Sequence, residues 1–421
     1  MRLKKRVVKT PSTGSFILRG FASLFLLFWT GCAMEGSRSA SGKEISVEAI
    51  QVANTMVERK QIPPELRSHF FALYAEGRQN SVLHAMRGGL AALRLQYREL
   101  AKEAFDQAIR EGEALQYGQA QAERTKSKFV GEKEKWFKGE PYERSALYLY
   151  RGLIYLEDQD FGNAAACFKR AQVMDITEEE DPQFTGDWTI AEFALALASY
   201  RQNDSSTADQ ALLRVRKFSS YREGMSFPNP ETNTLLIFES GKGPIKWGDG
   251  QFGEKLRFKE VVPSIEKIRV TQGEKRIDSA TESLYLQATT RGGRQVDAIL
   301  EDKASFKEDT QNATLGLAGG AVVASQTEQS GIAAGVLGLA AIGTGIFSAV
   351  TQPEADLRSW ENLPHSLHFV FLNVPPEGIE VEWQGVGSTT STKAKQVLKI
   401  NPDPQKKIQV LWVKRMLEEG A

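Results

Sequence analysis

The hydrophobic pattern of this 421-residue chain changes its period once, near residue 225. From Pro63 to about Tyr221, apolar residues recur three and four positions apart and internal prolines are few, which is typical of amphipathic helices. From Asn233 onward, short apolar runs are separated by Gly, Pro and charged residues, which is typical of strands. The sequence therefore predicts an α+β, multi-domain protein, with a helical domain at 61–224 and a β-rich domain at 230–415.

The apolar runs of the second half set the positions of the expected strands. Between two of these runs, Pro375-Pro376-Glu377-Gly378 has the composition of a tight turn, and we expect a β-hairpin there. The strands are expected at 235–238, 256–258, 265–270, 284–286, 367–372, 379–383, 397–400 and 408–413.

The helical half contains a spaced set of large and small residues that recurs. The best-formed copy is Tyr148, Gly152, Tyr155, Ala164, Phe168 and Ala171. This spacing resembles a tetratricopeptide repeat, in which small residues let the two helices of a hairpin pack closely. A second copy lies 63 residues earlier (Gly89, Ala101, Phe105, Ala108), and a third is Phe193, Leu197, Tyr200, Ala208 and Leu212. We expect two or three helical hairpins stacked into a short right-handed superhelix.

A stack of such hairpins has a concave face, which typically binds a peptide or a partner helix. The first helix of each hairpin lines that face, so the predicted partner-binding residues are Tyr142, Arg144, Tyr148, Arg151 and Tyr155. Two alternatives remain open. Tyr148 and Tyr155 could serve packing instead, and the groove could be filled by the protein's own segment 116–139.

The N-terminus has the layout of a secretory signal. The first 31 residues hold six cations and no acid, and an apolar run covers 20–29. That run is shorter than the roughly 20 residues needed to span a bilayer. Two small residues and Cys32 follow, which resembles a bacterial lipobox, although Trp29 stands where such motifs usually have Leu.

The lipobox resemblance implies a signal peptide at 1–31, removed before an acylated Cys32, and a flexible tether within 32–60. Ala33, rather than Asp, follows the cysteine, which implies sorting to the outer membrane, facing the periplasm. The alternative is an uncleaved signal anchor. Cys167 then has no disulfide partner in the chain, and we expect it to be a buried, unreactive thiol.

Charge and motif content exclude several classes of function. Removing the signal takes six of the 53 cations and leaves 47 against 53 anions, a net charge of −6, so nucleic-acid binding is not expected. No catalytic constellation, metal site or cofactor motif is present. His365 and His368 lie three apart in a predicted strand, so they would point to opposite faces and not share a metal. We assign Gly241 to Pro244 to a turn, and the acidic run at 178–181 to a solvated loop.

A Gly/Ala-rich insertion occupies 313–350, and its last 21 residues, 330–350, carry no charge. Gly331, Gly335 and Gly338 are candidates for close packing in a membrane or an oligomer, because small residues four apart let helices approach. Three interpretations compete: a helical hairpin packed on the β-rich domain or a neighbouring subunit, a segment inserted in the bilayer, and a mobile loop.

Several segments together resemble one family. They are 132–171, which contains 136–144, then 238–246, 299–302 and 355–360, the last followed by Leu363 and Pro364. This set is similar to a family of bacterial envelope lipoproteins that has no assigned biochemical role. The resemblance implies tetratricopeptide-like helices joined to a β-rich domain on a lipid anchor, and it implies no activity.

The leading functional hypothesis is a non-enzymatic, lipid-anchored periplasmic scaffold that holds one or more envelope proteins through its helical domain. The alternative is a subunit of an oligomeric export or secretion channel that uses the hydrophobic segment 330–350. Homo-oligomerisation is compatible with both. An enzyme acting on glycan or peptide is a third and weaker hypothesis, since no catalytic residues can be named.

Overall fold

The computed structural model describes residues 38–118, 135–175, 187–218, 224–259, 263, 265–289, 354–387 and 395–413. Over these ranges the protein is a mixture of helices and β-sheets, which confirms the predicted α+β class. Cys32, the insertion at 313–350 with Gly331, Gly335 and Gly338, the acidic run 178–181 and the segment 299–302 lie outside them.

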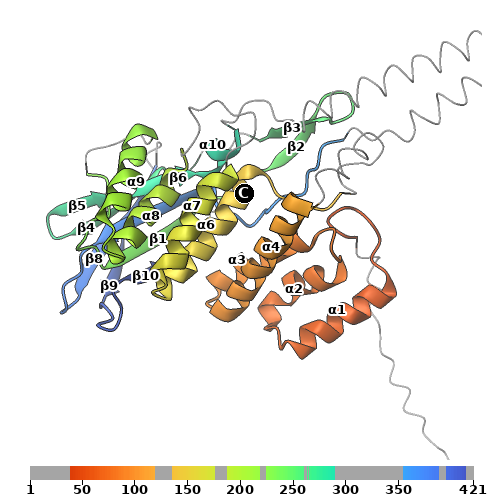
Figure 1. Cartoon of the computed structure of the whole chain (residues 1–421), viewed down its shortest axis with the longest axis horizontal. Coiled ribbons are helices and arrows are strands. Elements are labelled where there is room, and N and C mark those ends of the chain that lie inside the picture. Colours follow the sequence, from red (N-terminus) through yellow and green to blue (C-terminus); the bar gives the residue numbers. More distant parts are fainter. Residues whose placement is uncertain are drawn as a thin grey trace, which may run out of the picture. The chain divides into compact units, whose positions relative to one another are not determined.

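The helices follow one another as neighbouring antiparallel pairs (Figure 1). They begin earlier than predicted: the first helix starts at Val47, capped by the Ser46 hydroxyl, and its 13 residues lie within the range assigned to the tether. The helices are α1 (Val47–Arg59), α2 (Arg67–Ala75, after the short 3-10 helix η1, Pro64–Leu66), α3 (Ser81–Arg94), α4 (Arg98–Gly118), α6 (Pro141–Glu157), α7 (Phe161–Asp175), α8 (Thr189–Arg201) and α9 (Ser205–Phe218).

One turn geometry recurs at the ends of α1, α3, α6 and α8. In each case the second residue after the helix is left-handed: Gln61, Gln96, Gln159 and Asn203 have φ between 51° and 66°. The following N–H bonds back to the carbonyl five residues earlier, as Asp160 does to Tyr155. This closes the helix end by satisfying carbonyls that would otherwise lack partners. The repeat is therefore visible in the backbone, and it includes α1, which the sequence pattern had not revealed.

The predicted small-residue contacts are present in two hairpins. A Cβ placed on Gly152 of α6 would lie 2.5 Å from the Phe168 ring of α7, and one on Gly89 of α3 would lie 2.6 Å from the Phe105 ring of α4. Both pairs therefore pack ring against backbone. The helical hairpins are confirmed, and their assignment to the tetratricopeptide family stays a prediction.

These contacts give a stability prediction. Gly152→Ala should lower the free energy of unfolding by about 1–3 kcal/mol, because the Phe168 ring must move to admit the methyl group. Gly112→Ala in α4 is the matched control, since nothing lies within 4 Å of a Cβ there. That variant should be more stable by about 0.5–1 kcal/mol. Chemical denaturation measures both, and equal effects would contradict the packing argument.

The strands form two four-stranded sheets and a separate hairpin. The first sheet has the order β10-β1-β7-β6, with only β10 parallel to its neighbour, and the second has the order β5-β4-β8-β9. The hairpin is β2-β3. The strands are β1 (Thr234–Ser240), β2 (Lys246–Asp249), β3 (Lys255–Phe258), β4 (Lys267–Gln272), β5 (Lys275–Asp278), β6 (Ala280–Ser283), β7 (Ser366–Leu372), β8 (Ile379–Val386), β9 (Gln396–Ile400) and β10 (Gln409–Trp412).

Two predictions for the β-rich half were wrong. The expected strand at 284–286 is the start of a short helix, α10 (Leu284–Thr289), which directly follows β6. The expected hairpin at Pro375 to Gly378 does not form: Gly378 closes a turn onto the Pro375 carbonyl, but β7 and β8 belong to different sheets. Because β7 already pairs with β1 and β6, the turn carries the chain from one sheet to the other.

The first sheet is buried on both faces. Along β1, Leu235 and Ile237 join the apolar cluster that contains the helices, whereas Leu236 and Phe238 join a second cluster with Val270 of β4 and other residues of the second sheet. Strand side chains alternate between faces, so this division places the first sheet between the helices and the second sheet. The change from helix to strand falls between α9 and β1, close to its predicted position, and helices and sheet share one core.

Candidate functional site

The helix faces expected to line an open groove are covered by the chain itself. Residues 354–365, called here the crossing segment, run between the helices and the first sheet. Its Trp360 is 2% exposed, and its ring centre lies 6.2 Å from that of Phe105 in α4 and 5.9 Å from that of Tyr150 in α6. Beyond it, Phe193 of α8 stacks on Phe371 of β7. The chain itself therefore fills this face, with the crossing segment and the sheet as occupants rather than the expected segment 116–139, of which 119–134 lie outside the described residues.

A buried ion pair fixes the crossing segment to α6. One oxygen of Glu143 accepts the N–H of Trp360 at 2.6 Å, and the other accepts the Lys246 ammonium of β2 at 3.1 Å. Lys246 also donates to the carbonyl of Arg358 at 2.8 Å. Glu143 is fully buried and the Lys246 side chain is 1% exposed. A buried charge needs partners for all its polar atoms, and here the crossing segment supplies several of them.

Two arginines of α3 bind the main chain of the same segment. Arg87 donates to the carbonyl of Ser359 at 2.7 Å, and Arg94 donates to the carbonyl of Asn362 at 2.7 Å. Arg94 also pairs with Glu239 of β1, which accepts the Tyr150 hydroxyl as well. Charged side chains of α3 thus supply hydrogen bonds to carbonyl groups of the crossing segment.

This arrangement joins three of the four segments that carry the family resemblance. Glu143 belongs to 136–144, Lys246 to 238–246, and Trp360 to 355–360, and the contacts above bring all three together. Their separation along the chain gave no sign that they meet.

The five residues predicted to bind a partner are engaged within the fold. Arg151 forms a two-pronged ion pair with Asp106 of α4, and its guanidinium lies 3.7 Å from the centre of the Tyr155 ring. The Tyr148 hydroxyl of α6 donates to Glu113 of α4 at 2.7 Å. Arg144 donates to the carbonyls of Gly139 and Met174, and Tyr142 packs on Phe258. Their role in partner binding stays a prediction, and these contacts give them a structural role.

The histidine and cysteine predictions concern a buried imidazole and a thiol that is only partly buried, not fully buried as expected. His368 is fully buried, and both of its ring nitrogens lie within hydrogen-bond distance of hydroxyls, those of Ser240 and Thr281. Burial lowers the pKa of His368 to about 3. Such an imidazole is too weak a base to activate Ser240 at neutral pH. Burial also raises the pKa of the Cys167 thiol to about 11, as expected for an unreactive cysteine.

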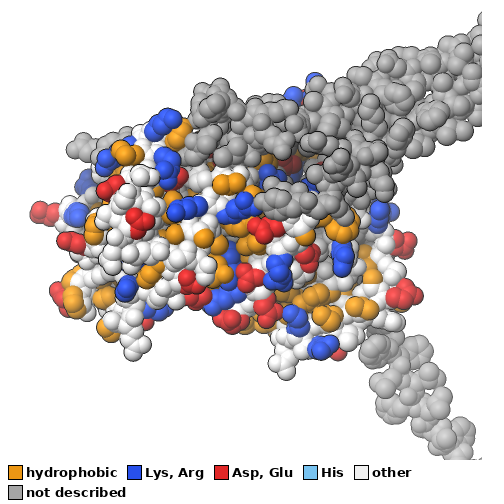
Figure 2. Space-filling model, viewed as in Figure 1, with side chains coloured by type: hydrophobic (Ala, Val, Ile, Leu, Met, Phe, Trp, Pro, Cys, Tyr) orange, Lys and Arg blue, Asp and Glu red, His pale blue; other side chains and the backbone are white. Residues whose placement is uncertain are grey.

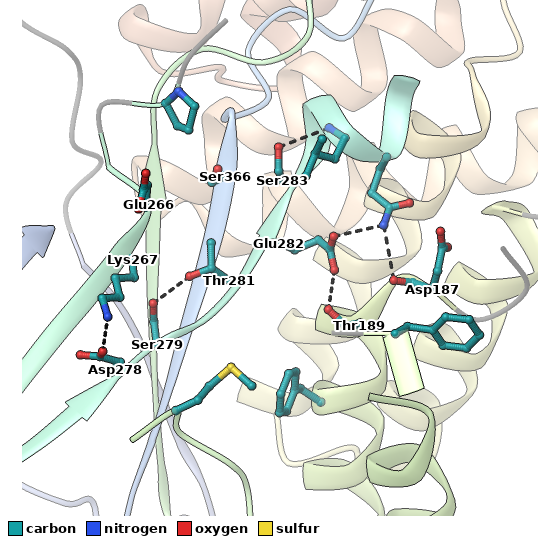
Figure 3. Close-up of a pocket in the computed structure, with 16 residues that line it drawn as sticks. Asp187, Thr189, Glu266, Lys267, Asp278, Ser279, Thr281, Glu282, Ser283 and Ser366 are labelled. Atoms are coloured by element: carbon teal, nitrogen blue, oxygen red, sulfur yellow. Dashed lines mark hydrogen bonds and ion pairs between the residues drawn. The ribbon is translucent and has the colours of Figure 1, made fainter. Parts of the chain in front are cut away.

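A cavity of about 380 Å³ lies where α8 and α9 meet β4, β5, β6 and α10 (Figure 3). We call it the β6 pocket. Its walls combine apolar side chains with acids, hydroxyls and one lysine. The lining residues are Asp187, Thr189, Phe193, Phe218, Met225, Pro263, Glu266, Lys267, Asp278, Ser279, Thr281, Glu282, Ser283, Leu286, Gln287 and Ser366.

Glu282 of β6 points from the pocket wall to the start of α8, as Figure 3 shows. It accepts the Thr189 hydroxyl at 2.6 Å and the Gln287 amide at 3.1 Å. Burial raises the pKa of Glu282 to about 7, against the opposing effect of these hydrogen bonds. The carboxyl is therefore partly protonated near neutral pH.

The charges on the opposite wall are paired. Lys267 and Arg269 both bind the carboxylate of Asp278. Burial acts to raise the pKa of Asp278, but the hydrogen bonds from Arg269 and Lys267 hold it below its usual value. Because Lys267 is paired with Asp278, Asp187 and the exposed Glu266 give the pocket lining a net negative charge.

β6 is an edge strand, and its outer edge faces this pocket. Leu284 donates its N–H to His365 next to β7, whereas Ser279 donates in the opposite direction, to Ile268 of β4. Backbone groups alternate in direction along an antiparallel strand, so those of Thr281 and the N–H of Ser283 point away from β7, whereas the Ser283 carbonyl caps the start of α10. An edge of this kind can pair with an added strand. No sequence pattern marks this site, because 280–283 has neither a long apolar run nor a recognisable motif.

Comparison with known proteins names no relative: no family model matches the chain, and no curated protein is similar to it. Within the described ranges, no helix combines the length and hydropathy that crossing a bilayer requires. Among those same residues, no cluster of three or more His, Cys, Asp or Glu side chains is placed to hold a metal ion.

Glu282 gives a prediction for stability against pH. A carboxyl whose pKa is raised on folding favours the folded state less as pH rises from the unfolded pKa to the folded one. Between pH 4.5 and 7 this should lower the free energy of unfolding by about 3 kcal/mol, a loss that Glu282→Gln removes. The free energy of unfolding of the Glu282→Gln variant minus that of the wild type, from denaturation at several pH values, should therefore rise with pH. Glu266→Gln is the control for loss of an exposed carboxyl, and a flat difference for Glu282→Gln would contradict the assignment.

Proposed function

We propose that this protein is a non-enzymatic scaffold of the bacterial cell envelope, anchored by acyl chains on Cys32 and facing the periplasm from the outer membrane. It holds an extended segment of a partner protein in the β6 pocket. The resemblance of the N-terminus to a lipobox and of four further segments to envelope lipoproteins supports the location. The observation that carries the binding mode is the outward-facing edge of β6 within an acidic, partly apolar cavity.

The chemistry of the pocket defines the segment that fits. Its main chain would pair with Thr281, an apolar side chain would pack on Leu286 and Phe218, and a basic side chain would lie near Glu266. Leu286 is 55% exposed, so the apolar contact is open to a partner. Backbone pairing accepts many sequences, and the acidic wall favours basic ones.

The visible surface of the helices offers no stronger candidate. Figure 2 shows cationic, anionic and apolar side chains intermixed on that face, without one large patch of a single kind. An intermixed surface is typical of a solvated face.

A photo-crosslinker at position 286 tests the binding mode in living cells. We expect an adduct with a discrete partner, because the side chain lies on the rim of the pocket. Glu266→Lys should weaken the adduct several-fold by reversing one charge of the wall. The matched control places the crosslinker at Leu213 of α9, which is 60% exposed and does not line the pocket. An adduct that forms equally at both positions, or that is insensitive to Glu266→Lys, would contradict binding in the β6 pocket.

The channel alternative rests on 330–350, which the structure does not describe. The mass of the mature protein in mild detergent, by light scattering with the detergent subtracted, separates the two functions. A monomer or dimer agrees with a scaffold, and a closed ring of many subunits would favour a channel.

A further inference from the structure

The chain that follows Cys32 and the chain that follows the insertion join the described fold at one edge. Ala40, eight residues after Cys32, lines a small cavity with Leu357 and Arg358, and its N–H bonds to Glu76 at 2.7 Å. Eight residues reach at most about 29 Å, so an acyl chain on Cys32 keeps this edge close to the bilayer. The insertion with the uncharged run 330–350 returns to the same place, because the described chain resumes at Glu354, three residues before Leu357.

The β2-β3 hairpin is connected to this edge. Ala355, five residues after the end of the insertion, donates its N–H to the carbonyl of Gly253 at 2.9 Å. Gly253 lies in the turn between β2 and β3. Leu256 of β3 and Ala355 also form a small buried apolar cluster. The hairpin therefore lies beside the point where the insertion rejoins the fold.

The ion pair of Lys246 determines which face of the hairpin points outward. Its side chain is turned inward to Glu143, and alternation along the strand turns Ile245 and Trp247 to the opposite side. These two side chains are 42% and 41% exposed. They lie opposite cations: Trp247 pairs in register with Arg257, and the Ile245 carbonyl accepts the N–H of Lys259.

We propose that this hairpin face, formed by Ile245, Trp247, Arg257 and Lys259, lies against the membrane and binds anionic lipid headgroups. The inference rests on the acylated Cys32 of the proposed function. Tryptophan prefers the interface between headgroups and acyl chains, and nearby cations are attracted to anionic lipid. Asp249 lies 3.5 Å from Arg257 and offsets part of that charge, and Lys255, which pairs in register with Asp249, adds a cation to the same face.

The test uses the full mature lipoprotein, with Cys167→Ala to remove the second thiol. Trp247→Cys carries an environment-sensitive fluorophore, and Leu213→Cys and Val397→Cys are controls at side chains 60% and 58% exposed. Mass spectrometry establishes acylation of Cys32, and flotation with vesicles of three parts phosphatidylethanolamine to one part phosphatidylglycerol establishes binding. Circular dichroism checks that each labelled protein is folded.

We expect brominated lipids to quench the label at 247 several-fold more than either control label. Replacing Arg257 and Lys259 by Glu should reduce that quenching, since each cation near an anionic surface is worth about fivefold in binding. Lys399→Glu, at a side chain 77% exposed in β9, is the matched control and should leave it unchanged.

Two outcomes would overturn the inference, and they are distinguishable. In the first outcome, the protein floats but its label at 247 is quenched no more than the control labels. The lipid anchor is then supported, the proposed orientation of the hairpin against the membrane is wrong, and the hairpin face would be available to a protein partner. A protein that lacks acyl chains and does not float would overturn the anchor of the proposed function, and the orientation with it.

Discussion

The buried pair of Glu143 and Lys246 is the contact on which the rest of the arrangement depends. It joins a helix, the β2-β3 hairpin and the crossing segment, which are far apart in the chain. Removing one partner of a buried pair leaves a charge without compensation and is strongly destabilising. The pair also sets the direction of its neighbours: with Lys246 inward, Trp247 must point outward, so the buried contact and the exposed face are two sides of one strand.

Elements with a strong period could be predicted from the sequence. The spacing of Gly152 and Phe168 predicted a helical hairpin, because a ring can lie this close to the backbone of a helix only where Cβ is absent. The run 235–238 gave a strand, since a strand covered on both faces is apolar throughout. Pairing was harder. Turn chemistry at Pro375 to Gly378 is the same whether the chain returns to its own sheet or crosses to another, so the wrong hairpin followed.

The candidate site could not be predicted, for a related reason. Glu282 matters because a sheet edge, a helix start and Gln287 surround it, and none of these relations is periodic in sequence. The repeat pattern predicts which residues lie on the first helix of a hairpin, but it does not predict which other segment of the chain packs on that helix. The predicted binding residues therefore do not lie on an open face. Arg151 and Tyr148 are on the right helix, yet they point to α4 rather than to the sheet.

Closure of the helical face has a consequence for recognition. In an open groove, arginines such as Arg87 and Arg94 would be donors available to a partner, but here they hold carbonyls of the crossing segment. A partner entering that face would have to displace Trp360 from an aromatic cluster and leave Glu143 with an unsatisfied oxygen. Each of these losses costs as much as a partner's own contacts could return. Recognition is therefore favoured where backbone groups already face outward, at the edge of β6, and the helical hairpins act as the support that holds this edge in place.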